Sequence, residues 1–139
     1  REVDNGVGAM AGAAKAEEEW LAEISERGQR VQGLLKTSVL DALKLALVDP
    51  PLGSAPDRPK AENAAVVQAA MLAVREGEVD GCVSALSDDE CELLMKFVYR
   101  FLSAPSTHSA AWLRWHAVVT ARTGPGAIVR VIAEKERTV

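Results

Sequence analysis

Few residues in this sequence have side chains suited to catalysis or metal binding. The sequence contains two histidines, His108 and His116, and two cysteines, Cys82 and Cys91. A zinc site needs cysteine and histidine clustered at short spacings, and these four residues are spread along the chain without such a cluster. We therefore predict that the protein holds no metal and no cofactor.

The same residues give little support to an enzyme. His116 follows Trp115 and could shuttle a proton, but a partly buried structural histidine at the end of an aromatic stripe is the better interpretation. Cys82 and Cys91 fall on apolar stripes of two expected helices, where cysteine behaves as a small buried hydrophobe. No serine or cysteine has a sequence context that marks a nucleophile. The sequence predicts that the protein is not an enzyme.

Composition limits the remaining classes. Of 139 residues, 48% are hydrophobic and 26% charged, a balance that favours a folded chain over a disordered one. The net charge is −4 and the pI about 5.2, and no basic stripe of the kind that binds nucleic acid is visible. The most apolar window, 64–74, is too short to span a bilayer, and 1–19 lacks the apolar core of a secretory signal. We expect an intracellular protein that binds neither nucleic acid nor membrane.

The elements that must position these residues are helices. Aromatic residues make up only 4% of the chain, and alanine is abundant, which favours helix over sheet. Apolar residues recur at helical spacing in six or seven segments: 16–36, about 38–47, 60–76, 78–86, 88–102, 108–122 and 127–137. Short links between helices predict antiparallel neighbours stacked as hairpins. The expected fold is all-α.

Local signals set several boundaries of these segments. Ser87 and Glu90 form a capping box that opens the fifth segment. Gly28 and Gly33 weaken the first segment and leave open a break into two helices. The apolar run 128–132 would also suit a strand, but a single strand has no partner for pairing, so we predict a helix there.

Aromatic residues give a hint of partner binding. Trp112 and Trp115 share one stripe of the sixth segment and should be core. Phe97 and Tyr99 flank Val98, which lies on the buried stripe of the fifth segment, so we predict that both point to other faces. Apolar residues on more than one face of a small helical protein indicate contact with another protein.

The C-terminal half resembles a known family, the fifth and smallest subunit of the actin-related protein 2/3 complex. The resemblance covers about residues 30–139 and rests on the order of its pieces. These pieces are Leu93-Leu94-Met95-Lys96-Phe97-Val98-Tyr99-Arg100, Pro105-Ser106, Ser109-Ala110, Leu113-x-Trp115-His116, Gly126-x-Ile128-Val129-Arg130-Val131 and Arg137-Thr138-Val139. Looser matches lie upstream at Gly33-Leu34-Leu35, Ala42-Leu43-x-x-Ala46-Leu47 and Pro50-Pro51.

The resemblance implies a fold and a set of partners. It implies six to seven short helices in an α-α superhelix (residues 16–139 as a single helical core domain), preceded by a flexible N-terminal arm over 1–15. It also implies a non-catalytic structural subunit in the cytoplasm and actin cytoskeleton. Such a subunit docks on the β-propeller subunit and the fourth subunit, and its arm reaches actin-related protein 2. The assembly nucleates branched actin filaments.

The arm is where the sequence departs from the family pattern. Family members carry an Arg-x-Val-Asp element followed by an acidic stretch, and Arg1, Val3 and Asp4 match that element. We predict these three residues as partner-binding residues, although the stretch 5–14 that follows is rich in glycine and alanine and uncharged. The alternative function is a free-standing helical adaptor that binds a peptide or a regulatory partner.

Overall fold

The described part of the chain is all-α, as the sequence predicts. The structure is a computed structural model, and it describes residues 15–134 and 138–139. Within these residues it contains seven α-helices, one short 3-10 helix and no strand. The elements are α1 (Glu17–Leu34), α2 (Val39–Ala46), α3 (Asp57–Ala73), η1 (Glu76–Glu78), α4 (Val79–Ser84), α5 (Asp88–Leu102), α6 (Ser109–Thr123) and α7 (Pro125–Ala133). The apolar run 128–132 lies in helix α7, so the strand alternative is wrong.

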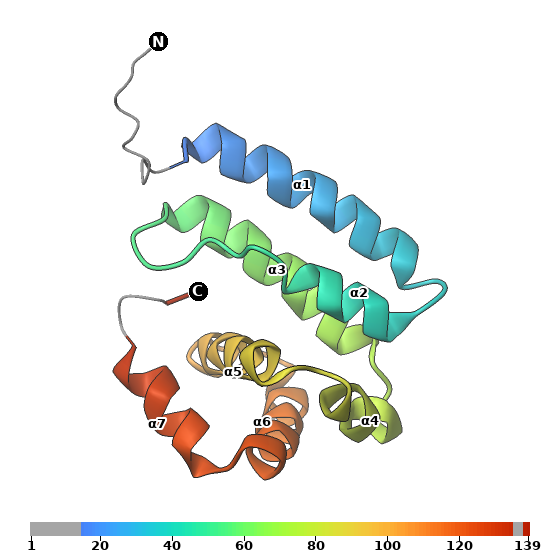
Figure 1. Cartoon of the computed structure of the whole chain (residues 1–139). Coiled ribbons are helices and arrows are strands. Elements are labelled where there is room, and N and C mark those ends of the chain that lie inside the picture. Colours follow the sequence, from blue (N-terminus) through green and yellow to red (C-terminus); the bar gives the residue numbers. More distant parts are fainter. Residues whose placement is uncertain (1–14, 135–137) are drawn as a thin grey trace.

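Helices α1, α2 and α3 pack on one another and alternate in direction (Figure 1). Helix α1 is not broken at either glycine. A Cβ atom at Gly28 would lie only 3.2 Å from the Cγ2 atom of Val66 on α3, so this glycine lets the two helices approach closely. The conformational cost of glycine in a helix is here offset by tighter packing between α1 and α3.

Helix α3 begins at Asp57, before the predicted start at residue 60. Pro59 therefore lies inside the first turn of the helix. The backbone N–H groups of the first turn have no partner within a helix, so a proline costs little there. The expected helix 78–86 is also shorter than predicted: Glu78 belongs to the 3-10 turn η1, and α4 ends at Ser84.

The second half of the chain is arranged around α5. This helix packs against α6 and α7, and α6 packs against α4 (Figure 1). The predicted capping box starts α5: the Ser87 hydroxyl accepts from the backbone N–H of Glu90 at 3.1 Å, and the Glu90 carboxylate accepts from that of Ser87 at 2.8 Å. The observed helix spans the predicted residues 88–102.

One hydrophobic core joins the two halves. Its largest fully buried side chains include Trp112 and Phe97, and it contains Val31 from α1, Leu43 from α2 and Met71 from α3. The ring centroid of Trp112 lies 4.7 Å from that of Phe101. Both tryptophans of α6 are therefore core residues, as predicted.

The residues Thr138 and Val139 are fixed to the first half of the chain and to α5. The backbone N–H of Gly53 donates to the Thr138 carbonyl at 2.9 Å. The Lys60 ammonium donates to the Thr138 hydroxyl at 3.2 Å, and Arg100 donates to the Val139 oxygen at 2.9 Å. Val139 is buried in the core. These bonds connect the α2–α3 loop and α3 with α5.

Candidate interaction site

The histidines and cysteines singled out in the sequence do not form a metal site in the described ranges. Within residues 15–134 and 138–139, no group of three or more histidine, cysteine, aspartate or glutamate residues is placed to hold a metal ion. In the same ranges, no helix has the length and apolar character needed to cross a membrane. Cys91 is buried and Cys82 half-buried. Burial raises the pKa of both thiols, and the nearby Glu78 carboxylate also raises the pKa of Cys82.

We expect the two thiols to react at different rates with a disulfide reagent such as DTNB. The thiolate is the reactive form, and Cys91 is 0% exposed, so Cys91 should react only when the chain unfolds. Cys82 should react slowly in the native protein. The labelling rate of each thiol is measured alone in the Cys82→Ser and Cys91→Ser variants, in both native and urea-unfolded samples. Fast labelling of the native Cys82→Ser variant would contradict the burial of Cys91.

His116 connects two helices. Its Nε2 atom lies 2.9 Å from the Tyr99 hydroxyl, and the two rings meet edge to face at 5.4 Å between centroids. Tyr99 belongs to α5 and His116 to α6, and the neighbouring Trp115 is only 2% exposed. This arrangement supports the interpretation of His116 as a structural residue that ties α5 to α6.

Phe97 lies off the main apolar stripe of α5, as predicted, but the inference that it is exposed for contact with another protein is wrong. Phe97 is 0% exposed and stacks on Phe101 with centroids 6.2 Å apart. Helix α5 is covered on more than one side, so residues off its main apolar stripe are also buried. Tyr99 is half-buried. The predicted partner-binding residues Arg1, Val3 and Asp4 lie outside the described residues.

Large apolar residues are exposed instead on α6 and α7. Leu113 is 59% exposed, Val129 66% and Ile132 63%. Val129 and Ile132 are three residues apart on α7 and so share one face of that helix. Val129 and Ile132 belong to the apolar run 128–132. A helix that packs on the core with one side cannot bury every residue of such a run, so the run itself was the sequence signal for exposed apolar residues.

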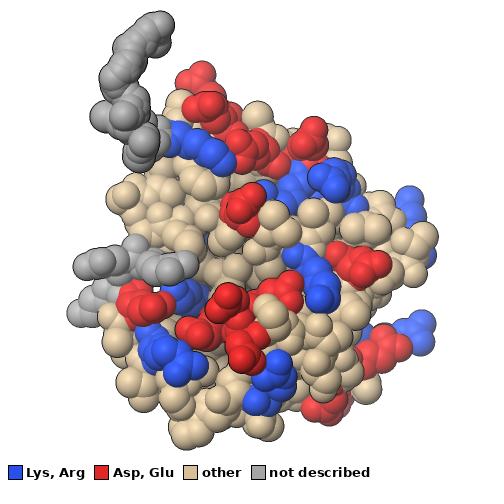
Figure 2. All heavy atoms as spheres, viewed as in Figure 1, with Lys and Arg blue, Asp and Glu red and all other residues tan. Residues whose placement is uncertain are grey.

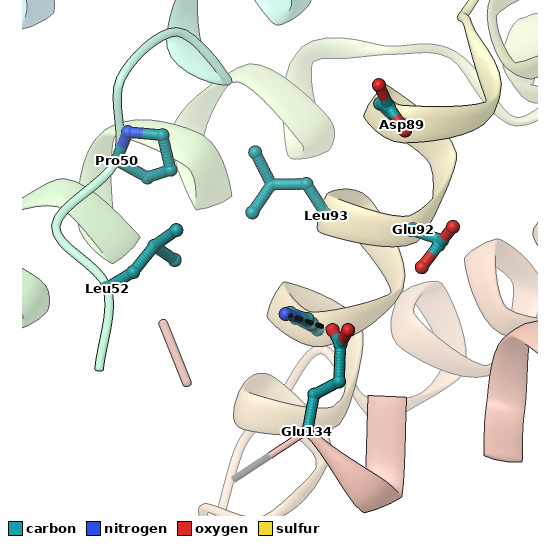
Figure 3. A pocket seen from close by; sticks show the side chains of 7 residues that line it. Pro50, Leu52, Asp89, Glu92, Leu93 and Glu134 are labelled. Carbon is teal, nitrogen blue, oxygen red and sulfur yellow. Dashed lines mark ion pairs between the residues drawn. The ribbon is translucent and has the colours of Figure 1, made fainter. Parts of the chain in front are cut away.

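A hollow beside α5 brings together residues from three parts of the chain (Figure 3). It has a volume of about 310 Å³. Its lining residues are Pro50 and Leu52 of the α2–α3 loop, Asp89, Glu92, Leu93 and Lys96 of α5, and Glu134 directly after α7. The α5 residues follow the i, i+3, i+4, i+7 spacing of one helix face. We call this hollow the α5 groove.

The α5 groove has apolar side chains on one side and carboxylates on the other. Figure 3 shows Leu93 pointing toward Pro50 and Leu52, with Asp89 and Glu92 on the far side of Leu93. The Lys96 ammonium lies 2.9 Å from a carboxylate oxygen of Glu134, and Lys96 is only 9% exposed.

Charge is distributed unevenly along this face of α5. Glu92 pairs with Arg130 at 3.3 Å, whereas Asp89 is exposed and makes no ion pair within the described part of the chain. Figure 2 shows acidic side chains gathered over α5. Beyond the pair formed by Lys96 and Glu134, a second hollow of about 260 Å³ includes Tyr99 and Arg100. The start of the α5 face is therefore acidic, and basic residues lie toward its end.

The fold and this surface together describe an all-α protein with a groove along helix α5. Comparison with known families extends this result. The family described as ARP2/3 complex 16 kDa subunit (p16-Arc) matches residues 8–139. The chain belongs to this family, which confirms the resemblance found in the sequence.

Named relatives agree with the family assignment. Actin-related protein 2/3 complex subunit 5 of Dictyostelium discoideum is 36% identical over 125 residues, covering 89% of this chain and 90% of the relative. Subunit 5B of Arabidopsis thaliana is 34% identical over 137 residues, covering 94% and 100%. The human subunit 5-like protein is 30% identical over 125 residues, covering 86% and 82%. The similarity thus extends over nearly the whole of each chain.

Proposed function

We propose that this chain is a non-catalytic structural subunit of the Arp2/3 complex, which docks on and stabilises the assembly that nucleates branched actin filaments. The observation that carries the proposal is the family match over residues 8–139. The relatives from Dictyostelium and Arabidopsis, which are named as subunits of this complex, are matched over 90% and 100% of their own lengths. The protein would act in the cytoplasm, in the actin cytoskeleton.

The partners follow from the same proposal. Residues 16–139 would form the single domain that docks on the β-propeller subunit and the fourth subunit. Residues 1–15 would form the arm that reaches actin-related protein 2, through Arg1, Val3 and Asp4. Neither nucleic acid nor a membrane is a proposed partner, and the proposed role requires no cofactor.

Co-elution is the direct test of this proposal. We expect the chain to elute from size exclusion in one peak with the β-propeller and fourth subunits of the same source. A chain lacking residues 1–14 should still join these two subunits but should hold actin-related protein 2 less tightly. Elution of the full chain alone, while the two subunits pair without it, would favour the free-standing adaptor.

A further inference from the structure

The α5 groove has features of a site for a peptide segment. Pro50, Leu52 and Leu93 are each only partly buried, so their apolar surfaces remain open toward the hollow. Its volume of about 310 Å³ is at the small end of the range for ligand sites, about 300–1,000 Å³. This volume is enough for one or two side chains of a partner, with Leu93 at the centre of the contact.

The charges around the hollow select the partner's chemistry. Among the described residues, the carboxylates of Asp89, Glu92 and Glu134 line the hollow. Glu92 is paired with Arg130 and Glu134 with Lys96, so the charge that the groove offers to a partner is that of Asp89. The Lys96 ammonium is withdrawn from solvent, while Asp89 is exposed at the rim. The exposed Asp89 carboxylate attracts a cationic partner and repels an anionic one, because complementary charge favours encounter and like charge disfavours it.

We infer that the α5 groove receives a segment of another Arp2/3 subunit that carries a bulky apolar side chain next to a lysine or arginine. The apolar side chain packs on Leu93, Leu52 and Pro50, and the basic residue pairs with Asp89. This inference rests on the proposed function, since it names the surface through which the chain joins the complex.

Two substitutions test the groove in the assembled complex. The measured quantity is the affinity of the purified chain for a complex prepared without it. We expect Leu93→Asp to weaken binding at least tenfold, because it places a carboxylate on the apolar side of the groove. Asp89→Lys should weaken binding several-fold and reduce its salt dependence, since one favourable charge contact is lost.

Matched controls separate docking from folding. Ala85→Asp and Asp80→Lys make the same changes of charge at exposed positions of the α4 region, and we expect both to bind like the unchanged chain. Thermal unfolding identifies any variant that is destabilised. If Leu93→Asp is destabilised, the affinity of the Asp89→Lys variant alone decides the test. Affinities of the folded groove variants within twofold of the unchanged chain would overturn the inference.

If the chain does not join the complex at all, the proposed function is refuted. A second measurement then tests whether the α5 groove binds a basic peptide. The isolated chain, labelled for NMR, is titrated with the synthetic peptides Ala-Leu-Arg-Arg-Ala and Ala-Leu-Glu-Glu-Ala. We expect the amide signals of Leu52, Asp89 and Leu93 to shift with the basic peptide only. No shift, equal shifts with both peptides, or shifts only from self-association of the chain would overturn the groove assignment.

Discussion

Replacing Trp115 with alanine is expected to lower the free energy of unfolding by about 3–5 kcal/mol, as other large-to-small aromatic substitutions in protein cores do. Trp115 is 2% exposed in the centre of α6. Removal of the indole ring loses its transfer free energy and leaves a cavity that rigid helices fill only partly. The measurement is urea unfolding followed by circular dichroism.

Leu113→Ala is the matched control for this substitution. It lies in the same helix and is 59% exposed, and leucine and alanine are both good helix formers. We expect a change within about 0.5 kcal/mol, which is usual for surface positions. A loss below about 1 kcal/mol for Trp115→Ala, judged against the costs of core substitutions, would contradict the burial of that ring.

Asn63→Leu is expected to cost about 2–3 kcal/mol, near the upper end for a hydrogen bond to a charged group. The Asn63 side-chain oxygen accepts from the Arg27 guanidinium at 3.1 Å, and both residues are buried. The Arg27 guanidinium otherwise reaches only the Asp49 carbonyl oxygen, at 3.5 Å, and its Nε atom has no hydrogen-bond partner within the described residues. Burial lowers the pKa of Arg27, and the nearby Asp49 and Glu23 carboxylates raise it by a smaller amount. Loss of the amide leaves a buried cation with a single weak acceptor.

The double variant Arg27→Met, Asn63→Leu provides the test of this mechanism. With the cation removed, an apolar pair can pack without any desolvated charge, and replacements of this kind are often tolerated or stabilising. We therefore expect the double variant to be more stable than Asn63→Leu alone in urea unfolding. Additive losses within about 0.5 kcal/mol would show that the two residues act independently.

The helices could be predicted from the sequence where a local signal fixes their ends. The reciprocal bonds of Ser87 and Glu90 involve only neighbouring residues, so the start of α5 follows from the sequence alone. Pro59 misled the prediction for α3, because a proline reads as a helix breaker unless the position of the first turn is known. At Gly28 the sequence left open whether α1 continues, because the benefit of this glycine comes from Val66 on another helix.

The interaction surface could not be predicted from the sequence in the same way. Periodicity identifies one buried stripe on a helix, and Phe97 lies off that stripe, yet α5 is covered on more than one side. The α5 groove joins Leu52, Leu93 and Glu134, which are far apart in sequence and meet only through tertiary packing. The family resemblance, in contrast, depended on the order of short motifs and required no such knowledge.

The anchoring of Thr138 and Val139 also has a consequence for the rates of folding and unfolding. Most helices pack on their sequence neighbours, and local contacts of this kind favour fast folding. The bond from Lys60 to Thr138 spans 78 residues and that from Arg100 to Val139 spans 39, so these contacts should form after the helices have paired. Interactions formed after the transition state slow unfolding and leave the folding rate unchanged. The last two residues would therefore determine how long a folded molecule persists, while the helices determine how quickly it forms.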